Sequence, residues 1–82
     1  MTVYSIYILR SLKDGKSYTG YTKNLERRFQ EHVTGRVKST RNRRPLKLIY
    51  SETFNTKTEA LIREKYLKTR QGRRELKTIT ST

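Results

Sequence analysis

The sequence contains no cysteine and only seven acidic residues among its 82 positions. Without cysteine, neither a disulfide nor a zinc–thiolate site can hold the fold together, which suits a reducing cytoplasm. No apolar run is long enough to span a membrane, and the apolar beginning of the chain lacks the basic region and cleavage site of a signal peptide. We therefore expect a small cytoplasmic protein that depends on its own apolar core.

The sequence also lacks internal repeats, low-complexity tracts and linkers, so we expect one domain that covers residues 1–82. A domain of this size buries only about 60% of the surface of its unfolded chain, so the core should be thin. We expect this core to lie at about residues 4–72, followed by a basic C-terminal tail.

Basic residues greatly outnumber acidic ones. Twenty lysines and arginines against seven aspartates and glutamates give a formal net charge of +13. This excess favours a polyanionic partner, because each phosphate contact releases counterions. An anionic membrane is the alternative, but no amphipathic terminal helix with aromatic anchors is present. The charge therefore favours nucleic acid over a membrane, and no small-molecule cofactor is indicated.

Hydrophobic periodicity and turn residues divide the chain into strands and helices. Asp14-Gly15 is a strong hairpin signal, Asn24 suits the cap of a first helix, and Thr56 and Glu59 form a capping box for a second. The predicted elements are strands 3–9, 17–21 and 46–52 and helices 25–34 and about 56–70. Residues 73–79 could add a short third helix. This β-β-α-β-α(-α) order predicts an α+β domain in which helices flank a small three-stranded antiparallel sheet.

Alternation along the first two strands predicts which side chains share a face of the sheet. Ile6 and Ile8 should lie on one face and Tyr7 on the other. Tyr18 and Gly20 should share a face, and the glycine leaves room for another group to approach closely.

Alternation in the third strand predicts that Leu46, Leu48 and Tyr50 lie on one side. Farther along the chain, Gly72 is expected to end the second helix, because glycine is frequent just after a helix C-terminus.

Glu64 stands among apolar residues of its predicted helix, four residues after Ala60 and three before Leu67. A carboxylate on such a face costs free energy unless a cation or hydrogen-bond donors satisfy it. A salt bridge at the edge of the core is the ordinary explanation. The alternative is a ligand for a hard cation, since one carboxylate completed by waters and a substrate phosphate suits Mg²⁺.

Two tyrosines, an arginine and the single histidine offer further chemistry. Tyr7 and Tyr18 fall on paired strands, where tyrosines often simply pack but also supply hydroxyl groups. Arg28 and His32 are four residues apart, so they lie on adjacent turns of one helix. Arg28 could bind phosphate or be merely solvated. His32 could accept a proton near neutral pH or be structural.

A basic loop precedes the third predicted strand. Contact with a phosphate backbone explains such a loop more simply than base recognition does. The candidate nucleic-acid-binding residues are Arg27 on the first helix and, in the loop, Arg36, Lys38, Thr40, Arg41, Arg43 and Arg44.

In their order and spacing, these motifs resemble the GIY-YIG nuclease superfamily, in particular its small single-domain URI-type branch of UPF0213-like proteins. Ser5-Ile6-Tyr7 and Tyr18-Thr19-Gly20 stand where the two name-giving motifs would be. Residues 24–32 are similar to the first helix of the family, and residues 58–68 to the helix that carries a metal-binding glutamate. The resemblance covers roughly residues 4–72.

The resemblance implies a metal-dependent endonuclease that acts on nucleic acid, most naturally DNA. The family arginine falls ten residues after the second motif tyrosine, which selects Arg28 rather than Arg27. Either tyrosine would help to activate the attacking water. The implied catalytic residues are Tyr7, Tyr18, Arg28, His32 and Glu64, and Glu64 would hold one Mg²⁺ or Mn²⁺ ion.

The sequence departs from the family pattern at several points. Ser5 and Thr19 replace a glycine and an isoleucine of the motifs, and no asparagine follows the glutamate helix near residues 70–75. A non-catalytic, basic nucleic-acid-binding module on the same scaffold is therefore the alternative function. No second DNA-binding domain follows, so substrate specificity would come from this domain or from a protein partner.

Overall fold

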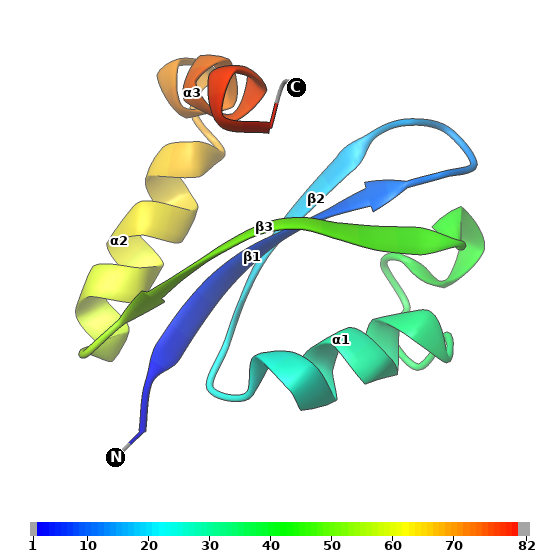
Figure 1. The fold of residues 1–82 in the computed structure, drawn as a ribbon, viewed down its shortest axis with the longest axis horizontal. Helices are drawn as coiled ribbons and strands as arrows, with labels where there is room; N and C mark the ends of the chain where they lie inside the picture. Colours follow the sequence, from blue (N-terminus) through cyan, green and yellow to red (C-terminus); the bar gives the residue numbers. More distant parts are fainter. Residues whose placement is uncertain (1, 81–82) are drawn as a thin grey trace.

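The computed structural model describes residues 2–80, which form a sheet and helices in the predicted order (Figure 1). The α+β class and the three-stranded antiparallel sheet are confirmed. None of the helices in the described part is long and apolar enough to cross a membrane. The elements are β1 (Tyr4–Ser11), β2 (Ser17–Thr22), α1 (Leu25–Val33), the 3-10 helix η1 (Arg41–Arg43), β3 (Leu46–Phe54), α2 (Lys57–Leu67) and α3 (Arg70–Thr80).

β1 is the central strand and pairs with both β2 and β3. Its two faces contact different helices. Ile6 and Ile8 belong to the core cluster that includes Ala60 of α2, whereas Tyr7 lies on the opposite face and contacts His32 of α1. Figure 1 shows α1 and α2 on opposite sides of the sheet. The predicted division of the β1 side chains between two faces is therefore confirmed.

β3 contains an extra residue that alternation alone did not predict. Ile8 pairs with Tyr50, whereas the next residue of β1 pairs with Leu48, so Ile49 forms a β-bulge. Because adjacent residues of β1 point to opposite faces, Leu48 and Tyr50 do so as well. The prediction that Leu46, Leu48 and Tyr50 share one side was therefore wrong. Tyr50 packs on the α2 side instead.

The second helix ends earlier than predicted, and Gly72 does not stop it. α2 ends at Leu67, and Gly72 is a buried residue inside α3. A Cβ atom at Gly72 would overlap the backbone of Tyr66 and Leu67. The glycine therefore serves the close approach of α3 to the end of α2, rather than the left-handed turn of a helix C-terminus.

The C-terminal segment is a packed helix rather than a tail. Leu76 of α3 is only 9% exposed and belongs to the core cluster. Arg63 of α2 also joins α3 to the sheet, because its guanidinium binds Glu75 of α3 at 3.1 Å and Glu52 of β3 at 2.9 Å. These two carboxylates raise the pKa of Arg63. The core thus extends beyond residue 72, which corrects the predicted boundary.

Substituting Gly72 should test this packing. Gly72→Ala is expected to lower the free energy of unfolding by about 1–3 kcal/mol, the usual cost of overpacking, although alanine favours a helix by about 1 kcal/mol. The new Cβ would push α3 away from the backbone of Tyr66. Urea unfolding measures the change, and Gln71→Ala on the exposed side of α3 is the control. A Gly72→Ala variant as stable as Gln71→Ala would contradict the close helix crossing.

Candidate active site

α1 places two of the predicted site residues against the sheet. The helix begins after Asn24, whose side-chain oxygen accepts a hydrogen bond from the Arg27 amide at 3.0 Å. It ends before Gly35, which has a positive φ of 82°. Between these caps, His32 is fully buried and Arg28 is partly exposed, whereas the side chain of Arg27 is 78% exposed. Arg28, and not Arg27, therefore faces the interior of the site.

His32 uses both ring nitrogens in buried hydrogen bonds. Its Nε2 lies 2.9 Å from the Tyr7 hydroxyl, and its Nδ1 lies 2.7 Å from the hydroxyl of Thr40. Burial, assisted by the nearby Arg28 guanidinium, lowers the pKa of His32 below its ordinary value. The imidazole is therefore neutral at neutral pH, so one nitrogen donates and the other accepts.

Gly20 of β2 makes room for the ring of Tyr7. The two residues are paired across the strands, and a Cβ atom on Gly20 would overlap the Tyr7 ring. Tyr18 completes an aromatic cluster, with its ring centroid 6.4 Å from that of Tyr7 and 5.3 Å from that of His32. Within residues 2–80, the Tyr18 hydroxyl makes no hydrogen bond. The close approach predicted at Gly20 is thus the approach of Tyr7, and Tyr18 stands beside it with its hydroxyl unengaged.

The Tyr7 phenol is influenced by charges from several elements. Burial raises the pKa of Tyr7 above its ordinary value, the Arg28 guanidinium opposes this shift, and Tyr18 and the Glu64 carboxylate add to it. The phenol is therefore protonated at neutral pH. Among the groups that act on this pKa, Glu64 of α2 has the smallest effect.

Glu64 is a half-buried carboxylate with one weak partner. Its side chain is 21% exposed and lies 3.5 Å from the Nζ of Lys68, which is 55% exposed. Such a long and solvated pair contributes little. The structure thus contains the salt bridge of the ordinary explanation for Glu64, but this salt bridge is weak.

The donors around Glu64 restrict the kind of metal that could bind. Among residues 2–80, no group of three or more His, Cys, Asp or Glu side chains could hold an ion by itself. A zinc site needs three or four protein ligands and does not fit. A single accessible carboxylate fits Mg²⁺ or Mn²⁺, whose remaining ligands would be waters and phosphate oxygens.

Arg28 carries a positive charge to the edge of this cluster. Its Nη1 lies 3.0 Å from the Glu31 carboxylate, which also lies 3.6 Å from Arg27. The Tyr7 phenol and Glu31 raise the pKa of the Arg28 guanidinium. A shallow hollow of about 430 Å³ opens beside Arg28 and is also bordered by Tyr21 of β2. A guanidinium with several donors at such an opening can bind a phosphate oxygen.

The candidate nucleic-acid-binding residues occupy different environments. Thr40 is fully buried and binds His32, so it cannot contact a nucleic acid directly, which corrects that expectation. Arg43 is partly buried, 3.5 Å from Asp14. The exposed members of the set are Arg27, Arg36, Lys38, Arg41 and Arg44.

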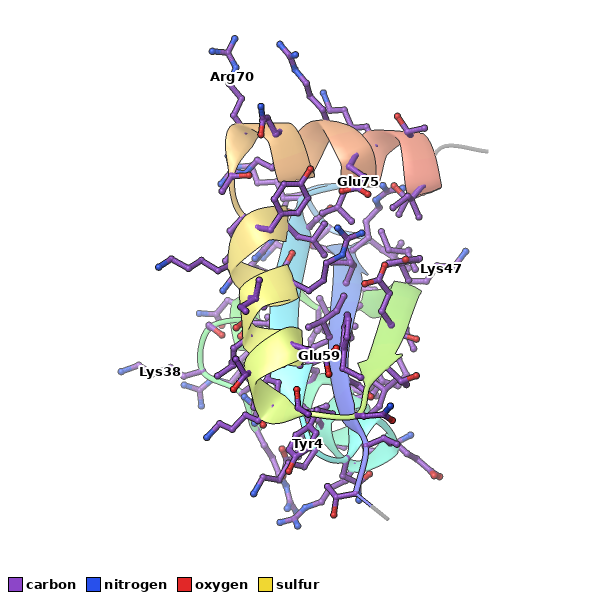
Figure 2. All side chains as sticks on the ribbon, turned by 90° about the vertical axis from the view of Figure 1, so that its left-hand side faces the viewer. Tyr4, Lys38, Lys47, Glu59, Arg70 and Glu75 are labelled. Atoms are coloured by element: carbon purple, nitrogen blue, oxygen red, sulfur yellow. The ribbon has the colours of Figure 1, made fainter. Side chains whose placement is uncertain are left out.

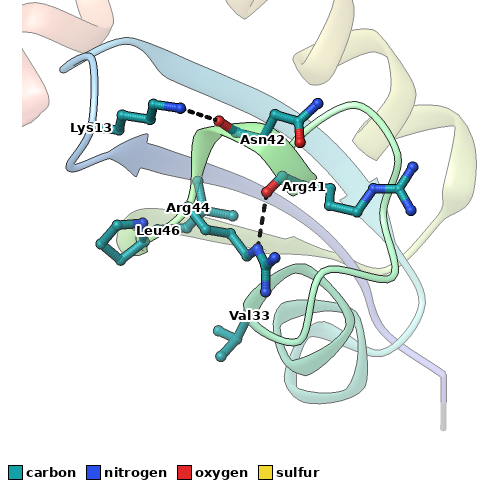
Figure 3. A pocket seen from close by; sticks show the side chains of 7 residues that line it. Lys13, Val33, Arg41, Asn42, Arg44 and Leu46 are labelled. Atoms are coloured by element: carbon teal, nitrogen blue, oxygen red, sulfur yellow. Dashed lines mark hydrogen bonds between the residues drawn. The ribbon is translucent and has the colours of Figure 1, made fainter.

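Three basic residues, Lys13, Arg41 and Arg44, help to line a second hollow, of about 580 Å³, next to η1 (Figure 3). The Arg44 guanidinium donates to the Arg41 carbonyl at 3.0 Å, and Lys13 donates to the Asn42 carbonyl at 3.2 Å. None of the described residues that border this hollow is acidic. The positive charges at this border would favour an anionic ligand, and nucleic-acid binding by the basic loop stays a prediction.

Comparisons with known proteins identify the family of this chain. The family model of the GIY-YIG catalytic domain matches residues 3–77. A UPF0213 protein of Staphylococcus saprophyticus is 46% identical over 81 residues, which are 98% of each chain. A UPF0213 protein of Clostridium perfringens is 46% identical over 77 residues, which are 93% of this chain and 82% of the relative.

A solved structure extends the likeness to three dimensions. The solution NMR structure of a UPF0213 protein from Bacillus halodurans has a TM-score of 0.58 and 36% sequence identity, and the match covers 94% of this chain and 84% of the other. Since the sequence matches also extend over nearly the whole chain, the protein belongs to the GIY-YIG nuclease family, among its UPF0213 members.

Proposed function

We propose that the protein is a metal-dependent endonuclease that hydrolyses phosphodiester bonds in nucleic acid, with DNA as the favoured substrate, in the cytoplasm. The observation that carries this proposal is the buried hydrogen bond between the Tyr7 hydroxyl and Nε2 of His32, which are 2.9 Å apart. The nearby Arg28 guanidinium opposes the effect of burial on the pKa of Tyr7. Family membership and the net charge of +13 support a nucleic-acid partner.

In this proposal Tyr7 takes a proton from the attacking water, because its hydroxyl is the one that is hydrogen-bonded to His32. If the Nδ1–H of His32 donates to Thr40, the Nε2 lone pair faces the Tyr7 hydroxyl. As the water oxygen attacks phosphorus, its proton would pass to Tyr7 while the phenol proton passes to Nε2. The bond from phosphorus to the 3′-oxygen breaks, and that oxygen takes a proton from solvent. His32 then returns its proton to solvent, and the products are a 5′-phosphate and a 3′-hydroxyl.

Arg28 and Glu64 would manage the charge of the phosphate. The Arg28 guanidinium would bind a non-bridging oxygen and so hold phosphorus near Tyr7. Glu64 would hold one Mg²⁺ or Mn²⁺ ion together with waters. An ion bound there supplies neutralisation of the phosphate and stabilisation of the leaving oxygen.

A non-catalytic nucleic-acid-binding module on the same scaffold is the second candidate. It is favoured by the ion pairs that engage two of the proposed catalytic groups, Arg28 with Glu31 and Glu64 with Lys68. Such a module would bind nucleic acid with strong salt dependence and no metal requirement. The next experiment separates the two functions.

Glu64→Gln should strongly slow metal-dependent cleavage. With Mg²⁺, we expect the wild type to cleave plasmid or branched DNA and the variant to be at least about 100-fold slower, because the ion that would stabilise charge at the phosphate is held less well. Glu26→Gln, an exposed change on α1, is the control and should cleave normally. Equal cleavage by Glu64→Gln and the wild type would remove Glu64 from the mechanism. No cleavage by any of the three proteins would favour the non-catalytic module.

Replacing each tyrosine by phenylalanine should identify the one that activates water. Tyr7→Phe is expected to slow single-turnover cleavage by about 100-fold or more, the usual contribution of a general base. Tyr18→Phe should have a smaller effect, because the Tyr18 hydroxyl does not bind His32. Both changes keep the aromatic ring, so circular dichroism should show an intact fold. The opposite order of effects would assign the base to Tyr18.

The buried His32 predicts a pH dependence of stability. Its folded-state pKa lies below the ordinary value of 6.5, so the unfolded chain binds the proton first as the pH falls. The stabilising contribution is complete above pH 6.5 and is lost as the pH falls through the folded-state pKa. Urea unfolding between about pH 8 and pH 5 should show this loss, and His32→Asn should show much less of it. A wild type of constant stability over this range would contradict a buried neutral ring at the only histidine.

A further inference from the structure

Four basic residues gather on the outer side of α3. Successive helical residues are about 100° apart around the axis, so these four fall within an arc of about 100°. The arc lies on the side away from Gly72 and Leu76, which are buried. All four residues are exposed. The α3 stripe consists of Arg70, Arg73, Arg74 and Lys77.

No acidic residue neutralises the α3 stripe in the described part of the chain. The single acid of α3, Glu75, points to the other side, where Arg63 binds both of its oxygens at 3.1 and 3.2 Å. Figure 2 shows Arg70 extending away from the protein while Glu75 lies between α3 and the sheet. Within residues 2–80, none of the four stripe residues forms an ion pair. The outer side of α3 therefore carries four uncompensated positive charges.

The α3 stripe is held in a fixed position relative to the candidate site. Arg63 connects α3 to β3 through two carboxylates, and Gly72 allows α3 to touch the backbone of α2. Thr69 links the two helices, because its hydroxyl donates to the Tyr66 carbonyl at 2.6 Å and accepts from the Gly72 amide at 3.1 Å. The stripe begins six residues after Glu64. A polyanion bound along α3 would therefore lie next to the helix that carries the candidate metal ligand.

The arrangement of α3 fits a phosphate backbone better than a lipid surface. A helix that binds a membrane inserts an apolar face into the lipid. The apolar face of α3 is already occupied, since Leu76 packs into the core. From Arg70 to Lys77 the helix rises by about 10 Å, which matches about three nucleotides of duplex at 3.4 Å each.

We propose that the α3 stripe is a second nucleic-acid-binding surface, which contacts the phosphate backbone of a duplex and positions it for the active site. This proposal rests on the endonuclease function proposed above. The surface is separate from the basic loop at residues 36–44, because α3 and η1 lie far apart in Figure 1. Its role is to bind and orient the backbone, and none of its residues takes part in the chemistry.

The test compares two variants that lose the same charge from different places. The stripe variant changes Arg70, Arg73, Arg74 and Lys77 to glutamine. The control variant changes four exposed lysines outside the stripe and the candidate site to glutamine, namely Lys16, Lys47, Lys57 and Lys65. Binding to a fluorescein-labelled DNA duplex is measured without divalent metal over a series of salt concentrations. Circular dichroism checks that both variants are folded.

We expect the stripe variant to bind at least about 10-fold more weakly at low salt than the control variant. A plot of log K against log salt concentration has a negative slope. In the stripe variant the magnitude of this slope should decrease by about 2 to 3, because each lost phosphate contact lowers it by about 0.9. In the control variant, both the affinity and the magnitude of this slope should decrease less. A third variant with Arg70, Arg73 and Arg74 changed to lysine keeps the charge and should bind like the wild type.

The outcomes distinguish this proposal from the proposed function. If the wild type binds and cleaves DNA but the stripe and control variants bind equally well, the stripe proposal fails and the endonuclease proposal stands. If the wild type neither binds nor cleaves the duplex, both proposals fail. If the stripe variant keeps duplex binding but loses binding to phosphatidylserine vesicles, a lipid surface replaces nucleic acid as the partner of α3.

Discussion

The burial of β1 on both faces is the constraint on which the remaining structure depends. Its apolar side chains on one face pack against α2, so the tyrosine between them must enter the layer under α1. A buried hydroxyl without a partner costs about 1–3 kcal/mol, and His32 supplies that partner. The buried imidazole needs a partner of its own, which is Thr40. A single polar residue in the central strand thus explains why three polar side chains meet in the interior of a protein with a thin core.

Most of the acidic residues hold parts of the fold together, and most of the basic residues lie on the surface. Five of the carboxylates lie in ion pairs with an arginine or lysine, and a sixth closes the capping box of α2. Arg63 alone gathers two carboxylates, from β3 and α3. Because the few acids are engaged within the fold, they leave most of the basic side chains without a partner on the surface. The local arrangement of the acids, as well as the net charge of +13, therefore determines where a polyanion can bind.

Local sequence signals predicted most of the fold. Contacts between elements that are distant in the sequence could not be predicted from these signals. Asn24 and Thr56 act on amides three residues away, so their capping roles could be recognised from the sequence. The role of Gly72 depends on where α3 crosses α2. The sequence does not distinguish a glycine that ends a helix from one that allows two helices to pack closely. Thr40 lies in a basic loop and has no feature that indicates burial against His32. For the candidate site, the spacing of motifs selected the residues, but the packing around Tyr7 emerged only from the fold.

The bulge at Ile49 has a consequence for which parts of the chain can change in length. Deleting Ile49 would make Leu48 and Tyr50 neighbours, and the regular alternation of a strand would keep these two side chains on opposite faces of the sheet. Deleting Ser51 from the regular part of β3 would instead move Glu52 to the opposite face, and Arg63 would lose its contact with the sheet. The hairpin turn at residues 12–16 is exposed, and exposed loops accept insertions at little thermodynamic cost. Length variation among related chains should therefore gather at that turn and at the bulge, and it should avoid the part of β3 that follows Tyr50.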